Sequence, residues 1–297
     1  MKKFFLLASF FASNVVNFAY CRSIDCVDPW EPTQFISRVS CGYQHSFEER
    51  NDFWIQTHQP LYATPNTFRN TVFMQFRASI RSEAPVGSYE SFNVGGVYRL
   101  LSDCENWLFG LNGFYCMSGY NRNENVSIGI DMRNKWMTLT ANCYSHINGW
   151  RMLTLVDGVT TSTRALNGTN FEFTFPMPHI PSLRLGGGLF YWNTLTKENT
   201  TGYHVSAIIN IIGPLSIEGG RWSEINNSTH NNYVSAELRF GFPNHIQYTL
   251  FKDCFTKNAY PPRNLRRFIL DPVIKIEHLN FEKKLTGSDG ILIGRGT

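Results

Sequence analysis

The chain has 297 residues, of which 15% are aromatic and 17% are charged. Charged residues make up about 25% of a typical soluble domain, so this balance favours a membrane barrel with aromatic girdles. The chain holds no stretch of about 18 consecutive apolar residues, which excludes a transmembrane helix of the usual kind.

The formal net charge of +4 is concentrated in the C-terminal tail. Residues 243–297 hold 9 Lys and Arg against 5 Asp and Glu, whereas residues 1–242 hold 18 of each. A basic tail is common in proteins that bind nucleic acid. In an exported chain we interpret it as a segment that is solvated or packed in a lumen, and we expect no nucleic-acid partner.

The N-terminus has the pattern of a secretory signal peptide over residues 1–19, with a basic start, a short apolar run and Ala19 as its last residue. The apolar run is too short to cross a bilayer. Cys21 would suit a lipoprotein, but Tyr20 is too bulky for the usual lipid-attachment site. We expect residues 20–34 to form a periplasmic N-terminal segment.

Apolar and polar side chains alternate through most of the region from Ser91 to Phe242. Residues 125–133 give the clearest case, because apolar side chains at the even positions separate small or charged ones. A strand has a period of two, so one face of each segment meets an apolar medium and the other meets water or polar groups.

About twelve segments of this kind can be counted. They lie near residues 35–46, 52–62, 70–80, 91–101, 106–117, 126–132, 136–147, 169–176, 182–192, 202–212, 214–223 and 232–242. An even number of strands lets the sheet close, and closure removes edges that lipid cannot hydrogen-bond. Such a barrel is wider than one of about eight strands, so its lumen must hold water, a plug or a threaded segment.

The connections between these segments differ in length. Residues 148–168 form a long polar connection, whereas residues 212–214 form a tight turn, and long loops face outward from the cell. A soluble β-sandwich would also alternate, but its exposed face would carry more Lys and Glu. We therefore predict an all-β fold, a transmembrane antiparallel β-barrel over residues 35–242 with a C-terminal linker tail over residues 243–297.

Strand parity places a set of polar residues on the inward face. They are Asp131, Arg133, Asn142, His146, Glu172, Arg184, His204, Glu218, Glu237 and Arg239. Because buried charges must be paired or solvated, we interpret them as a structural network that lines the lumen and holds a threaded segment or orders water. Arg221 points to lipid by the same parity, so we expect it to reach the interface or to be turned by a bulge at Gly219-Gly220.

The seven cysteines have no CxxC spacing, so the sequence shows no zinc or redox motif. An odd number leaves at least one cysteine unpaired within the chain, and we expect Cys116 and Cys143 to be small wall residues inside strands. Gly186-Gly187-Gly188 lies in the middle of a strand and is expected to relieve crowding or bend the wall. We expect no catalytic, cofactor or metal site.

His146-Ile147-Asn148-Gly149 is similar to the His-x-Ser-Asn-Gly site of outer-membrane phospholipases. That site needs a serine nucleophile that the histidine activates. Ile147 stands where this serine would be, and Ser145 points to the opposite face of its strand. We therefore predict that the protein is not an enzyme and that His146 is a polar residue of the lumen.

Several short motifs follow one another in a fixed order. They run from Asn106-Trp107-Leu108-Phe109-Gly110 through Asn121-Arg122, Ser127-Ile128-Gly129-Ile130, Asn142-Cys143-Tyr144 and Gly149-Trp150 to Pro176-Met177-Pro178. Their order resembles that of the inverse autotransporter β-domain, the barrel of the intimin and invasin family. The resemblance covers roughly residues 35–242 and implies a bacterial outer-membrane barrel that translocates or anchors a C-terminal segment.

The tail carries a second resemblance. Leu270-Asp271-Pro272-Val273 and the following Phe281-Glu282-Lys283-Lys284 are similar to the family segment just after the barrel, where a linker threads the pore. By this likeness, residues from Asn244 to about Lys284 fill the lumen. The N-terminus would be periplasmic, and the C-terminus would be led to the cell surface.

The chain also departs from the family pattern. Family adhesins carry long C-terminal arrays of immunoglobulin-like domains, whereas only about a dozen residues follow Lys284, too few for a folded domain. The sequence therefore does not support adhesion through a passenger domain. The resemblance implies as partners outer-membrane lipid, the barrel-assembly and periplasmic chaperone machinery, and a host or cell-surface receptor. The alternative function is a stand-alone outer-membrane pore or structural wall protein.

Overall fold

The computed structural model describes residues 38–47, 50–64, 69–83, 87–118, 122–156, 159–195, 198–226, 230–240, 249–251, 255–260, 265–273, 281–287 and 290–296. The expected signal peptide and the expected periplasmic segment before residue 35 lie outside the described residues. Cys21, Cys26 and Cys254 also lie outside them.

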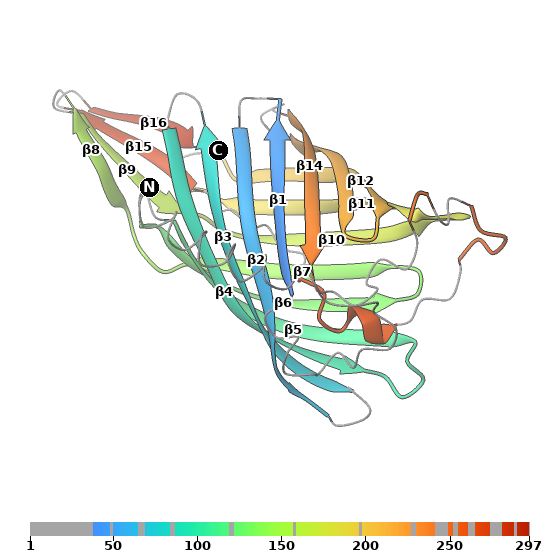
Figure 1. Cartoon of the computed structure of the whole chain (residues 1–297). Helices are drawn as coiled ribbons and strands as arrows, with labels where there is room; N and C mark the ends of the chain where they lie inside the picture. The colour runs from blue at the N-terminus through green and yellow to red at the C-terminus, as the bar shows by residue number, and fades with distance from the viewer. Residues whose placement is uncertain are drawn as a thin grey trace.

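Twelve antiparallel strands close into a barrel in the order β1-β14-β13-β12-β11-β10-β7-β6-β5-β4-β3-β2 (Figure 1). They are β1 (Val39–Ser46), β2 (Arg50–Ala63), β3 (Asn70–Glu83), β4 (Gly87–Leu101), β5 (Trp107–Ser118), β6 (Glu124–Asn134), β7 (Thr138–His146), β10 (Asn167–Met177), β11 (Ile180–Asn193), β12 (Thr200–Ile212), β13 (Leu215–Glu224) and β14 (His230–Phe240). Each expected segment corresponds to one of these strands. The predicted all-β barrel is therefore confirmed.

Alternation gives the barrel an apolar outer face and a polar inner face. On β6, Ile128 and Ile130 are 70% and 57% exposed on the outside, whereas Ser127 and Asp131 are buried on the inside. Exposed apolar area in water is unfavourable by about 25 cal/mol per Å². Rows of such side chains around the whole barrel therefore match a hydrocarbon surrounding.

Inward-facing glycines lie directly opposite large side chains of the neighbouring strand. We call each such position a glycine notch, and the pairs are Gly42–Trp54, Gly95–Phe114, Gly110–Asp131, Gly129–Asn142, Gly168–Trp192, Gly188–Glu172, Gly202–Phe190 and Gly220–Tyr233. A Cβ atom on Gly42 would lie 2.1 Å from Trp54 Cζ2. The large side chain thus occupies the space that a Cβ on the glycine would need, which fits the expected relief of crowding at Gly188.

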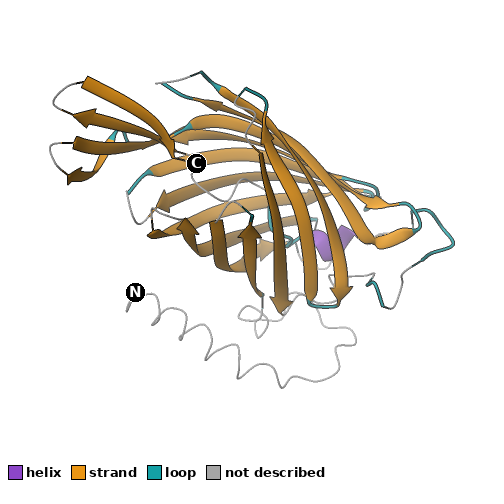
Figure 2. Cartoon of the chain, turned by 90° about the horizontal axis from the view of Figure 1, so that it is seen from above, coloured by secondary structure: helices purple, strands orange, loops and turns teal. Residues whose placement is uncertain are grey.

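A second sheet of four strands projects from one end of the barrel (Figures 1 and 2). Its order is β16-β15-β9-β8, with β8 (Arg151–Val156), β9 (Val159–Ala165), β15 (Phe281–Gly287) and β16 (Gly290–Gly296). The interpretation of residues 148–168 as a polar loop was wrong, and the tail was not expected to hold strands. The pairing of β9 with β15 joins segments far apart in the sequence, which no local pattern reveals.

The two ends of the barrel differ. At the turn end, two-residue turns at 178–179 and 213–214 join neighbouring strands, and the tail follows β14. At the hairpin end, the β8–β9 hairpin connects β7 to β10. Outer-membrane barrels generally have short periplasmic turns and longer outer loops.

Arg221 on β13 is exposed on the outer face, as parity predicts. The pairing of β12 with β13 runs without interruption past Gly219-Gly220, and its register shift lies between Asn210 and Ile212. The proposed bulge at the glycines was therefore wrong. In the part of the chain that the structure describes, no helix is both long and apolar enough to span a membrane.

Candidate functional site

The ten residues predicted to line the lumen all lie on barrel strands. Asp131, Arg133, Asn142, Glu172 and His204 are buried, whereas His146, Arg184, Glu218, Glu237 and Arg239 are partly buried. The structure brings most of them into groups, and one of these groups contacts the tail.

Asp131 lies between two arginines in the barrel interior. Arg133 Nε is 3.1 Å and Arg99 Nη2 is 3.4 Å from the same carboxylate oxygen, Asp131 Oδ2. Arg99 comes from β4 and the other two residues come from β6. The side chains of all three are almost fully buried, and two positive charges face one negative charge.

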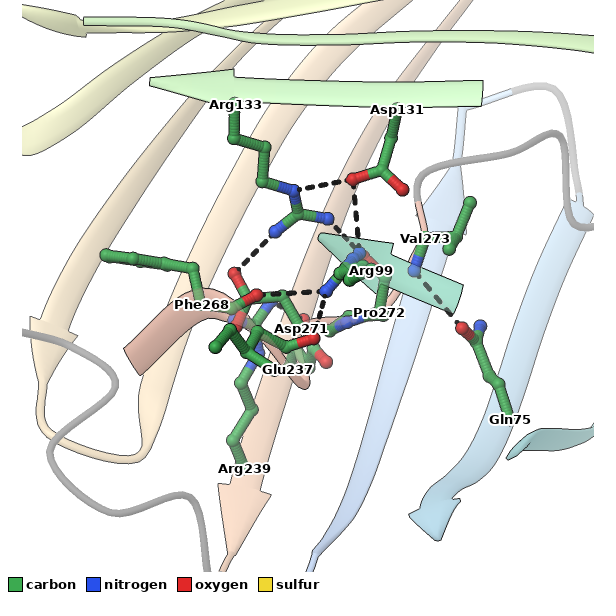
Figure 3. A network of polar contacts seen from close by, with 11 residues as sticks. Gln75, Arg99, Asp131, Arg133, Glu237, Arg239, Phe268, Asp271, Pro272 and Val273 are labelled. Atoms are coloured by element: carbon green, nitrogen blue, oxygen red, sulfur yellow. Dashed lines mark hydrogen bonds and ion pairs between the residues drawn. The ribbon is translucent and has the colours of Figure 1, made fainter. Parts of the chain in front are cut away.

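Residues 265–273 of the tail, here called the tail segment, supply the missing acceptors. Arg99 Nη1 donates to Phe268 O (2.9 Å) and Ile269 O (2.7 Å). Arg133 Nη1 lies 2.8 Å from Asp271 Oδ2, and Arg133 Nη2 donates to Pro272 O at 2.9 Å (Figure 3). Hydrogen bonds to charged groups contribute about 1.5–3 kcal/mol each.

Gln75 on β3 adds a further contact, because its Oε1 accepts a hydrogen bond from Val273 N at 3.1 Å (Figure 3). We call Gln75, Arg99, Asp131 and Arg133 the tail clamp. With Asp271, the clamp contains two arginines and two aspartates and is neutral in total. This balance is what a buried ionic group requires.

Apolar side chains surround the tail clamp. The cluster contains Phe73, Val97, Leu101, Leu108 and Phe114 from the barrel and Leu265, Phe268, Ile269, Leu270 and Val273 from the tail. The short 3-10 helix η2 (Leu265–Phe268) presents its apolar side chains to this wall. Full burial of such a side chain contributes about 1.5–3 kcal/mol, so this inner patch binds the tail in addition to the clamp.

A second polar group lies on β10, β12, β13 and β14. His204 Nδ1 is 3.2 Å from Glu172 Oε2, and His204 Nε2 is 2.8 Å from Tyr233 Oη. Tyr233 in turn donates to Glu218 Oε1 at 2.8 Å. Trp222 stacks on the imidazole with ring centroids 4.3 Å apart. This group has the closed hydrogen bonding of a wall network.

Four of the five remaining predicted residues have other partners. Arg239 Nη2 is 2.7 Å from Glu237 Oε2, and Asn142 donates to Asn170 at 3.1 Å. His146 at the hairpin end is 2.6 Å from Asn167 Oδ1. Among the described residues, no group of His, Cys, Asp and Glu is arranged to hold a metal ion.

The selection from the sequence left out Gln75 and Arg99, although parity placed both on the inward face. Their role depends on tail atoms that follow roughly 170 to 200 residues later. The one available signal was Asp271-Pro272, which belongs to the tail motif with the family resemblance. An inward arginine together with an acidic residue in that motif could have indicated the contact.

The closed barrel with an apolar belt and a polar interior defines an integral membrane protein of the outer-membrane barrel class. The model of the family described as "Inverse autotransporter, beta-domain" matches residues 34–259. The chain belongs to this family, and the predicted resemblance is therefore confirmed.

Solved structures with a similar fold are distant in sequence. A chain from work on the in-meso crystallization of membrane proteins is 14% identical with a TM-score of 0.65, covering 83% of this chain and 100% of that chain. An outer-membrane channel from Pseudomonas putida F1 is 12% identical with a TM-score of 0.48, covering 73% and 100%. Outer membrane phospholipase A from Escherichia coli is 8% identical with a TM-score of 0.45, covering 69% and 93%.

Proposed function

We propose that this barrel is an outer-membrane translocator that holds its own tail in the lumen and anchors or exports the C-terminal segment at the cell surface. The observation that carries this proposal is the contact between the tail segment and the tail clamp. Buried arginines of the wall donate hydrogen bonds to main-chain carbonyls and a carboxylate of the tail. A segment that lay in the barrel without a specific role would not be expected to neutralise the buried charges of the wall.

The described parts of the tail also support a path from one end of the barrel to the other. Leu250 N donates to Asn210 O near the turn end, and the tail segment binds inside the barrel. Farther along the chain, β15 pairs with β9 at the hairpin end. Under this proposal, the chain between Asn244 and Lys284 threads the lumen.

The proposed work is geometric and not enzymatic: a closed polar conduit and a peptide that fills it. The N-terminus would lie in the periplasm, and the C-terminal segment would lie outside. The apolar outer face supports outer-membrane lipid as a partner. The barrel-assembly and periplasmic chaperone machinery and a cell-surface or host receptor are partners proposed from family membership alone.

An accessibility experiment tests the proposal. We expect an epitope tag placed after Thr297 to be reached by antibody and by protease in intact cells. A tag that is reached only after the outer membrane has been permeabilised would contradict the proposal.

Cys104 provides an internal control for this experiment. It is exposed in the turn after β4 at the turn end, and a hydrogen bond from Ser102 lowers the pKa of its thiol, which favours the reactive thiolate. In a chain with Cys104 as its single cysteine, a membrane-impermeant alkylating reagent should label it only after permeabilisation. Labelling in intact cells would contradict the proposed orientation, in which the turn end faces the periplasm.

A further inference from the structure

We propose that the β8–β9 hairpin is a strand-capture site, which binds the emerging tail as an added antiparallel strand outside the barrel. Its ligand class is an extended polypeptide, recognised mainly through main-chain hydrogen bonds. The inference rests on the proposed function, because the captured strand is the part of the tail that would have left the lumen.

The main evidence is the register of the pairing. β15 lies along β9 from Phe281 opposite Ala165 to Thr286 opposite Thr160. On its other edge, β9 pairs with β8. The hairpin therefore uses one edge internally and presents the other to the tail, which is the geometry of recognition by strand addition.

The composition of the hairpin suits this role. β9 reads Val-Thr-Thr-Ser-Thr-Arg-Ala, and β-branched residues such as Thr and Val favour an extended backbone. A two-stranded hairpin alone is only marginally stable in water, whereas additional strands stabilise it. The capture of β15 and β16 supplies these strands, so the hairpin and the tail stabilise each other.

A polar contact fixes the register of the captured strand. Glu282 lies directly opposite Arg164, and Arg164 Nε is 3.4 Å from Glu282 Oε1. The other carboxylate oxygen, Oε2, accepts a hydrogen bond from Leu195 N at 3.2 Å, which ties the strand to the loop after β11. Glu282 is 2% exposed, so a shift of the tail by one residue would remove the carboxylate from this buried position.

Lys284 and Arg164 add a contact to one ring. Lys284 Nζ and Arg164 Cζ each lie 5.9 Å from the centre of the Trp150 ring, just before β8. Two cations at the face of one tryptophan are held there by the quadrupole of the ring. Arg164 and Trp150 therefore recognise the Glu-x-Lys pattern that Glu282 and Lys284 form on the captured strand.

Disulfide trapping in the full-length chain tests the inference. Thr161 and Leu285 are register partners, and partner Cα atoms in antiparallel strands are about 4.5–5.5 Å apart, within reach of a disulfide. In a chain whose native cysteines are replaced by alanine, we expect Thr161→Cys with Leu285→Cys to cross-link in intact cells under a mild oxidant. A protease site in the loop after β13 reveals the link, because the denatured fragments stay joined until reduced.

The matched control moves one cysteine by two residues. Thr161→Cys with Lys283→Cys keeps the same face of β15 but makes the two residues diagonal neighbours about 7–8 Å apart, so its cross-link should be at least several-fold weaker. Equal yields from the two pairs would overturn the register. Heat-dependent gel migration confirms that each variant still forms a folded barrel.

Charge reversal gives an independent arm. Arg164→Glu should reduce the specific cross-link several-fold, and Arg164→Glu with Glu282→Arg should restore much of it. A surface-exposed tag without any specific cross-link would overturn strand capture and leave the proposed function standing. A tag that stays inaccessible in intact cells would overturn the proposed function itself.

Discussion

At the scale of single residues, Arg99 and Arg133 explain why the barrel and its tail depend on each other. A guanidinium group buried in a lipid-surrounded barrel needs several acceptors, because its charge is otherwise very unfavourable. Asp131 alone neutralises only one of the two. Asp271 and the carbonyls of Phe268 and Ile269 provide the rest, so removal of the tail would leave these arginines with fewer acceptors and one positive charge without its carboxylate partner.

Asp271→Asn should therefore destabilise the folded protein strongly. Removal of one partner of a buried ion pair is typically unfavourable by about 3–5 kcal/mol, which a urea unfolding titration in detergent micelles would measure. Glu105→Gln is the matched control, because Glu105 and its partner Arg266 are 41% and 43% exposed. Exposed pairs contribute about 0–1 kcal/mol, and an equal effect of both substitutions would contradict the clamp.

Residue-level prediction from the sequence was good for side-chain direction and poor for partners. Alternation placed Asp131 and Arg133 inward because a strand has only two faces. It could not show that Asp271 neutralises Arg133, since their distance in space depends on the path of the tail through the closed barrel.

At the scale of elements, the barrel strands could be predicted because each carries its own alternating pattern. The second sheet could not be predicted in this way. β8 and β9 read as a polar connection, and their strand conformation depends on the partner β15, which follows more than 100 residues later. The β-branched residues of β9 favour an extended backbone, but they do not show that its partner lies in the tail.

The glycine notches give a prediction for strand pairing. In Gly42→Ala, the three atoms nearest to the new Cβ all belong to Trp54, at 2.1 to 2.6 Å. We expect a loss of about 1–3 kcal/mol from overpacking, again measured by urea unfolding. Gly96→Ala is the control, because a Cβ there meets nothing within 4 Å.

A compensating change makes this test sharper. The double variant Gly42→Ala with Trp54→Leu should recover part of the lost stability, because leucine is smaller than tryptophan and the clash of the new Cβ is with the indole ring alone. Strictly additive effects of the two substitutions would show that the notch does not couple these strands.

At the scale of the whole molecule, the tail solves the problem of a barrel too wide to be filled by its own side chains. From strand number alone, the sequence predicts that the lumen must hold water, a plug or a threaded segment. The structure places the tail segment, which begins with η2, against an apolar patch of the inner wall. The number of strands sets the width of the barrel, whereas inward side chains such as Phe73 and Leu108 determine what occupies the lumen.

Deletion of residues 244–297 should therefore open a conducting path. We expect a clear rise in single-channel conductance in planar bilayers, because the tail segment no longer occupies the lumen. Glu105→Gln, which keeps the tail, should conduct like the original chain. An unchanged conductance after the deletion would favour the stand-alone pore or wall protein, provided that heat-dependent gel migration shows an intact barrel.

The pairing of a glycine with a large side chain on the next strand constrains how the sequences of related barrels can change. A large side chain that faces a glycine fits in only one register of the two strands. A shift in register would place it opposite a residue with a side chain, and the two would clash at several strand pairs at once. Related chains should then exchange the two members of such a pair together, with the small and the large partner sometimes trading strands. Covariation between directly facing wall positions would be the trace of that exchange.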